Sequence, residues 1–159
     1  MSDFDPNAAA RPDAGVFGLP HGRAEAACVL VPVPFDATTS YRDGARNGPA
    51  AIRVASAQVD LFDLQTGRPY ERGIYMLDAE PRIAALSASA RAAAEPLIDQ
   101  GGAEDGDADA VALVDAAGAE VNAIVQREVA AILSAGQIPG IVGGDHSVPF
   151  GAIAATAAQ

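Results

Sequence analysis

Hydrophobic residues cluster in short apolar runs along the chain, and these runs predict the strands. Nearly continuous apolar runs occupy residues 26–35, 73–77 and 138–142, each interrupted or bordered by glycine or proline. Runs of this length are typical of buried strands, and the nearly continuous apolar character of the first one, which prolines close, favours a strand covered on both faces. Residues 59–64 instead alternate apolar and acidic side chains, which predicts a half-exposed strand.

The segments between these runs carry the spacing of helices. Pro49 suits the first position of a helix over residues 49–55, and the alanine-rich segment 81–96 predicts a second helix that kinks or breaks at Pro96. A long third helix, ending at Gly136, is predicted by residues that recur every three or four positions. These are Val111, Val114, Gly118, Val121, Val125, Val129 and Ile132. Because strand, helix and strand follow in this order, we expect a mostly parallel sheet flanked by helices.

Composition and charge narrow the class of protein. The 159 residues carry a formal net charge of −11 and include no lysine, so a nucleic-acid partner is not expected and a cationic substrate is favoured. Residues 1–26 lack a sustained period and predict an irregular arm without the features of a signal peptide. No apolar stretch is long enough to span a bilayer, and the single cysteine permits no internal disulfide. We therefore expect a cytoplasmic protein with no membrane contact.

Candidate chemistry lies in the stretch GGDHSVPFG, which places Asp145 and His146 just after the last predicted strand. Loops at the carboxyl ends of parallel strands commonly carry reactive groups, and glycines leave room there for an ion or a substrate. Taken alone, the pattern favours a loop histidine paired with its neighbouring aspartate over a metal ligand. The acidic residues Asp105, Asp107 and Asp109 lie in a polar segment and are interpreted as a solvated charge run or a helix start.

Two motifs in a fixed order change the interpretation of this loop. GGDHSVPFG resembles the first metal motif of the arginase and agmatinase family, the ureohydrolases, and PVPFDATTSYRDGARNGPAAIRVAS (32–56) is similar to the first loop of its agmatinase-type members. The resemblance implies a three-layer α/β/α domain with a parallel sheet. It also implies a centre of two manganese ions that hydrolyses a guanidinium group to urea and an amine.

The same resemblance assigns roles to individual residues. It implies that His146 is a metal ligand, and that Asp145 is not a ligand but braces the loop or the groups around it. Ser147 is expected to cap the helix that follows. Four residues of the first loop are expected to serve loop architecture and contacts at the rim: Thr39, Ser40, Arg42 and Arg46.

The family's remaining ligands have no counterpart in this sequence. No histidine, aspartate or glutamate follows His146, and one imidazole cannot hold two manganese ions. We therefore expect residues 27–159 to be the amino-terminal half of a ureohydrolase domain, with a fold incomplete at the C-terminus. In isolation this half is expected to be inactive, and the complete protein is expected to be a homo-oligomer.

The substrate and the role of the chain leave alternatives open. Agmatine is the favoured substrate of the complete enzyme, because the first loop has the agmatinase-type form. Arginine, guanidinobutyrate and formiminoglutamate, on which other family members act, are alternatives. The competing hypothesis is a non-catalytic remnant or half-domain that acts as a structural or interaction piece.

Overall fold

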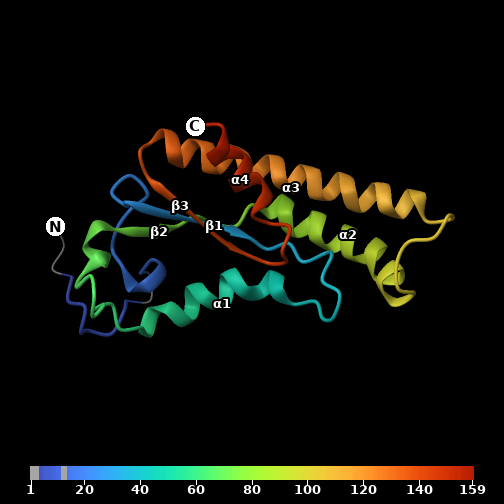
Figure 1. Cartoon of the computed structure of the whole chain (residues 1–159). Helices are drawn as coiled ribbons and strands as arrows, with labels where there is room; N and C mark the ends of the chain where they lie inside the picture. Colours follow the sequence, from blue (N-terminus) through green and yellow to red (C-terminus); the bar gives the residue numbers. More distant parts are fainter. Residues whose placement is uncertain (1–3, 12–13) are drawn as a thin grey trace.

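A parallel sheet of three strands forms the middle of the protein, in a computed structural model that describes residues 4–11 and 14–159 (Figure 1). The strands are β1 (Cys28–Val33), β2 (Ile74–Met76) and β3 (Ile138–Gly143). Their order in the sheet is β2-β1-β3, so β1 is central. Both neighbours run parallel to β1, which confirms the three predicted strands and the parallel sheet.

Helices cover the sheet on its two sides. They are α1 (Gly48–Ala55), α2 (Pro81–Asp99), α3 (Ala108–Ser134) and α4 (Phe150–Ala157). Figure 1 shows α1 on one side of the sheet and α2 and α3 on the other, with α4 packed along α3. This arrangement confirms an α/β/α order of layers. None of the helices in the described ranges is long and apolar enough to cross a bilayer.

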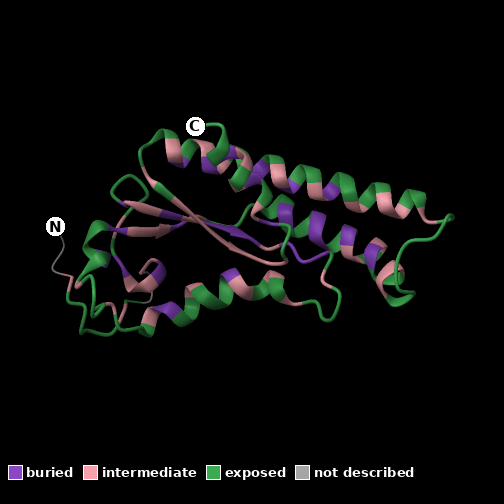
Figure 2. Cartoon of the chain, viewed as in Figure 1, coloured by how far each residue is buried: buried purple, intermediate pink, exposed green. Residues whose placement is uncertain are grey.

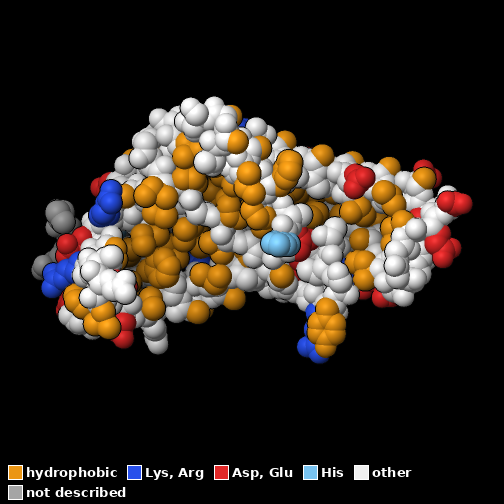
Figure 3. Space-filling model, viewed as in Figure 1, with side chains coloured by type: hydrophobic (Ala, Val, Ile, Leu, Met, Phe, Trp, Pro, Cys, Tyr) orange, Lys and Arg blue, Asp and Glu red, His pale blue; other side chains and the backbone are white. Residues whose placement is uncertain are grey.

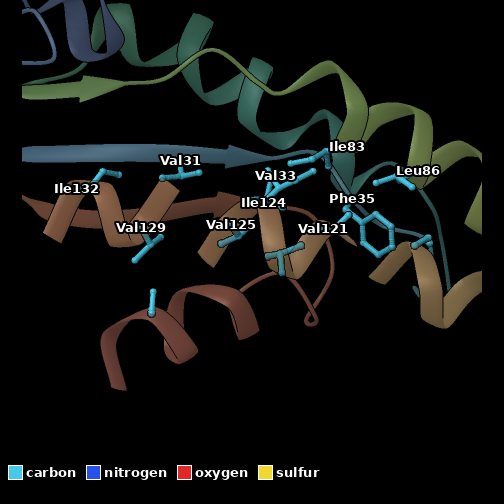
Figure 4. Packing of buried hydrophobic residues seen from close by; sticks show 14 of the residues in the cluster. Val31, Val33, Phe35, Ile83, Leu86, Val121, Ile124, Val125, Val129 and Ile132 are labelled. Carbon is cyan, nitrogen blue, oxygen red and sulfur yellow. The ribbon is translucent and has the colours of Figure 1, made fainter. Parts of the chain in front are cut away.

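The main core lies between the sheet and the pair α2 and α3. Alternate side chains of β1, namely Val29, Val31 and Val33, are buried in the same cluster as residues of these helices, as the two-residue period of a strand requires. Figure 2 shows the burial along β1, and Figure 4 shows Val31 and Val33 among the residues of the helices. The predicted apolar face of α3 supplies much of the other half of this core. Its buried residues are Ala117, Val121, Ile124, Val125, Val129 and Ile132. Val111 and Val114 are only half-buried, because the first turns of α3 extend beyond the sheet (Figure 1).

Two local predictions are wrong. Residues 59–64 form no strand and contribute only an isolated bridge between Asp63 and Gly67. The Asp63 carboxylate accepts hydrogen bonds from the amides of Gln65 and Thr66, which favours a turn over a ladder. Helix α2 does not break at Pro96 but continues to Asp99, because the missing N–H removes a single hydrogen bond three residues before the helix ends.

The described part of residues 1–26 contains turns and a 3-10 helix (Val16–Gly18) but neither a strand nor an α-helix. It is nevertheless packed on the domain, because Val16 and Leu19 are buried and the Phe17 amide donates to Ser56 Oγ at 2.9 Å. Other 3-10 helices are Ala45–Asn47, Ser56–Gln58 and Pro69–Arg72. The arm thus closes the side of the domain on which α1 lies.

Candidate functional site

The site is built where the loops after β1 and β3 begin side by side. Val33 pairs with Gly143 at the carboxyl ends of these parallel strands, so both loops leave the sheet at the same edge. The amide of Asp145 then donates to the carbonyl oxygen of Phe35 at 2.8 Å. A Cβ atom at Gly144 would lie 1.8 Å from that oxygen, so only glycine permits this approach. The backbone therefore fixes where the histidine loop starts.

Asp145 joins the two loops through its side chain. Its Oδ2 accepts hydrogen bonds from the Thr38 amide (3.0 Å) and the Thr38 hydroxyl (2.7 Å). Its Oδ1 accepts from the amide (3.0 Å) and the hydroxyl (2.5 Å) of Ser147. The prediction that Ser147 caps α4 is wrong, because Pro149 occupies the cap position and the Ser147 hydroxyl is engaged by Asp145. Both carboxylate oxygens of Asp145 are thus used within the loops.

His146 follows directly and is exposed. In the described part of the chain its imidazole has no hydrogen-bond partner, so Asp145 holds the backbone around His146 and leaves the ring free. Across the same residues, no group of three or more His, Cys, Asp or Glu side chains could hold a metal ion. A centre of two manganese ions needs several donors for each ion. The residues of this chain therefore do not fit such a centre by themselves.

Asp36 carries a buried charge beneath the first loop, and its role there was not predicted from the sequence. Its side chain is 0% exposed. Its Oδ2 accepts from the amides of Gly44 (2.7 Å) and Arg46 (3.1 Å), and the Arg46 guanidinium donates to its Oδ1 at 3.1 Å. Ser87 of α2 donates its hydroxyl to Oδ1 and accepts from the Asp36 amide, both at 3.2 Å. This one carboxylate ties the loop after β1 to α2.

The environment of Asp36 keeps its carboxylate ionised. Burial acts to raise its pKa, but the hydrogen bonds from Arg46 and Gly44 and the charge of Arg46 together lower the pKa below its usual value. The same pair raises the pKa of Arg46, chiefly through the hydrogen bond to Asp36. A signal for this contact exists in the sequence: Ser87 is a polar residue on the apolar face of α2, between Ile83 and Ala90.

Other residues of the first loop have the structural jobs expected of them. Thr39 accepts hydrogen bonds from Arg91 at its carbonyl oxygen (2.7 Å) and hydroxyl (3.2 Å), which fastens the loop to α2. Arg42 lies over the ring of Tyr41 at 5.2 Å, and both Arg42 and Ser40 are exposed. The acidic run is confirmed as a solvent loop and helix start, because Asp107 accepts from Gln100 and from the Glu104 amide just before α3.

Comparison with known proteins identifies similar chains. The sequence profile of the Arginase family matches residues 26–159. The N(1)-aminopropylagmatine ureohydrolase of Synechocystis sp. is 46% identical over 54 residues, which are 33% of this chain and 18% of that protein. The protein of the same name from Thermus thermophilus is 41% identical over 64 residues, 40% of this chain and 22% of its own length.

A solved structure agrees with the fold. The crystal structure of the agmatine ureohydrolase of Thermoplasma volcanium superimposes with a TM-score of 0.58 at 26% sequence identity. The match covers 86% of this chain and 36% of that structure. The chain thus spans little more than a third of the solved relative, and the described strands and helices correspond to one part of a larger domain.

Proposed function

Because the chain belongs to the arginase family, we propose that it forms the amino-terminal part of a manganese-dependent ureohydrolase that hydrolyses agmatine to urea and an amine. The observation that carries the proposal is the joined pair of loops, which presents His146 at the carboxyl edge of the sheet in a chain matched by the family over residues 26–159. In the complete protein His146 would be one ligand, and the other donors would come from the rest of the domain.

Asp145 would prepare His146 for this role. Asp145 would fix the backbone on which the imidazole stands, since it accepts hydrogen bonds from Thr38 and Ser147 on either side of the loop. The free imidazole would then be available to a metal ion through a ring nitrogen. Asp145 would thus act as a brace and not as a ligand.

Agmatine is a linear cation, and the net charge of −11 favours its approach. N(1)-aminopropylagmatine is a second candidate, because the relatives from Synechocystis and Thermus thermophilus carry that substrate in their names. Both substrates present the same guanidinium group to the centre and differ in the chain attached to it. Comparing urea release from the two compounds distinguishes these candidates.

We further propose that the 159 residues are inactive by themselves and that the complete protein is a cytoplasmic homo-oligomer. Inactivity follows from the donor count, because one imidazole does not assemble a pair of metal ions. Light scattering of the complete protein would test its oligomeric state. Fractionation of the source cells would test its location.

The function is tested with a chimera. Residues 26–159 are joined to the part of the Thermus thermophilus relative that follows its equivalent segment, and urea release from both guanidino compounds is measured with manganese present. We expect the chimera to release urea and the 159-residue chain to release none. Urea release by the short chain, or an inactive but folded chimera, would contradict the proposal.

A further inference from the structure

A groove of about 430 Å³ lies between the end of α2 and the start of α3, where both helices project past the carboxyl edge of the sheet (Figure 1). Its apolar walls are Leu97 and Ile98 of α2 and Val111 and Val114 of α3. These four side chains are only half-buried, because the sheet does not reach this part of either helix. Clefts of this size with mostly apolar walls are typical of sites for small molecules. We call this cleft the α2–α3 groove.

The α2–α3 groove begins beside the loop of His146. Thr38 and Ser40 of the first loop belong to its lining, and both are exposed. Thr38 is also the residue whose amide and hydroxyl donate to Asp145, which directly precedes His146. A ligand whose head group lies at the histidine can therefore extend its tail past Thr38 into the groove.

The groove combines an uncharged lining with an acidic rim. Every lining residue is uncharged. The segment 92–126, which contains the ends of both helices and the turn between them, carries eight of the 21 acidic residues of the chain and no arginine or lysine. Arginines of α2 pair with two of the eight, and the other six lie between Asp99 and Asp115. Figure 3 shows acidic side chains gathered at this end of the molecule, with hydrophobic side chains exposed beside them.

We propose that the α2–α3 groove binds the aliphatic tail of a linear guanidino-polyamine. The proposal rests on the proposed function, because the guanidinium of the same molecule would lie at His146. Its methylene groups pack against the apolar walls, which removes apolar surface from water. Its ammonium groups stay hydrated at the acidic rim, which attracts them.

The groove discriminates between the candidate substrates by their tails. Agmatine ends in an ammonium group after a short chain, so it fills little of the groove. An added aminopropyl unit supplies further methylene groups for the walls and a second ammonium group for the rim. Arginine and guanidinobutyrate carry a carboxylate in the tail, which the acidic rim repels. We therefore expect the polyamine tail to bind most tightly.

Spermidine tests the groove without any urea release, because this linear triamine is what remains when N(1)-aminopropylagmatine loses urea. It is titrated into the 159-residue chain with labelled methyl groups, and NMR spectra are recorded. We expect the methyl signals of Leu97, Val111 and Val114 to shift. Binding should weaken about tenfold between about 50 and 500 mM salt. Glutarate, a linear dianion, is the control ligand and should shift none of these signals.

Matched variants locate the contact. Val114→Arg places a cation in the groove and is expected to weaken spermidine binding about tenfold or more. Leu113→Arg is the control, because it adds the same charge one residue away, at an exposed position outside the lining. We expect this control to weaken binding less than about threefold.

The rim is probed without disturbing the packing. Asp105 and Asp109 are exposed, so Asp105→Asn combined with Asp109→Asn should leave the fold intact and weaken spermidine binding about three- to tenfold. Asp60→Asn combined with Glu71→Gln removes the same charge from the segment before β2, at the opposite end of the sheet. We expect this pair to change binding less than about twofold.

The outcomes separate this proposal from the proposed function. Absence of shifts with spermidine, or equal losses in Val114→Arg and Leu113→Arg, would overturn the groove proposal even if the chimera releases urea. Spermidine binding to the chain with a folded but inactive chimera would leave the groove standing and count against the ureohydrolase activity. In an active chimera, Val114→Arg should raise KM for N(1)-aminopropylagmatine about tenfold more than KM for agmatine, with kcat nearly unchanged. Equal changes in both KM values would remove the tail from the groove.

Discussion

Asp36 shows how a single buried charge can organise a loop. We expect Asp36→Asn to lower the free energy of unfolding by roughly 2–4 kcal/mol at neutral pH, because it leaves Arg46 and two amides without their anionic acceptor. Urea unfolding of the chain measures this change. Asp43→Asn is the control: Asp43 contacts the same guanidinium at 2.9 Å in an exposed pair, so we expect a loss below about 1 kcal/mol.

The same residue sets a pH dependence whose sign follows from its pKa. Because the folded pKa of Asp36 is lowered, the stabilisation by its carboxylate is complete above the ordinary aspartate value of 3.8 and is lost as the pH falls through the folded pKa. Asp36→Asn should therefore flatten part of the loss of stability in acid. An unchanged acid limb in urea unfolding below pH 4 would contradict the assigned ionisation.

The hydrogen bond between Thr38 and Asp145 is a second contact whose contribution to stability can be measured with a single substitution. We expect Thr38→Val to cost about 1 kcal/mol, because it removes the hydroxyl that donates to Asp145 Oδ2. Hydrogen exchange should become faster at the amides of Asp145 and Ser147, both of which are bonded within the joined loops. Thr66→Val removes a similar hydroxyl bond at an exposed turn and should leave these two amides unchanged.

At the scale of the element, the packing of α4 on α3 depends on Gly151. A Cβ atom there would lie 2.3 Å from the carbonyl oxygen of Asn122, so Gly151→Ala should push the helices apart and destabilise the chain by about 1–3 kcal/mol. Gly118→Ala is the matched control, because nothing lies within 4 Å of its added Cβ. That substitution should instead stabilise α3 by about 0.5–1 kcal/mol, and thermal unfolding of the two variants measures the contrast.

Elements with a clear period could be predicted from sequence, and local side-chain chemistry explains the exceptions. The continuous apolar run of β1 and the three- and four-residue spacing of α3 reflect their burial directly, so both elements were predicted. The alternation at 59–64 was misleading, because the Asp63 side chain closes a turn there. At the site, motif resemblance singled out Asp145 and His146; the structure shows Asp145 joining the two loops, and the ligand role of His146 stays a prediction. The bond between Asp36 and Ser87 could not be seen in the same way, because the two residues are 51 positions apart and meet only when α2 packs on β1.

At the scale of the whole molecule, the prediction concerns how metal ions distribute over the completed domain. We expect His146→Ala in the chimera to reduce bound manganese from two ions to one per chain and to lower urea release at least 100-fold, because one site loses its imidazole. His21→Ala is the control, since His21 packs against Gly73, which precedes β2 at the opposite end of the sheet. Elemental analysis of both variants gives the count, and unchanged manganese in His146→Ala would remove this residue from the centre.

The difference in length between helix α3 and the strands has a consequence for local unfolding. Helix α3 has 27 residues and is about 40 Å long, whereas a six-residue strand such as β1 is about 20 Å long. The first turns of α3 and the last turns of α2 therefore pack against each other beyond the end of the sheet (Figure 1). We expect local unfolding to begin in these projecting turns and to stop where the helices pack on β1. The loops that carry Asp36 and His146 should therefore stay folded while the far ends of α2 and α3 unfold.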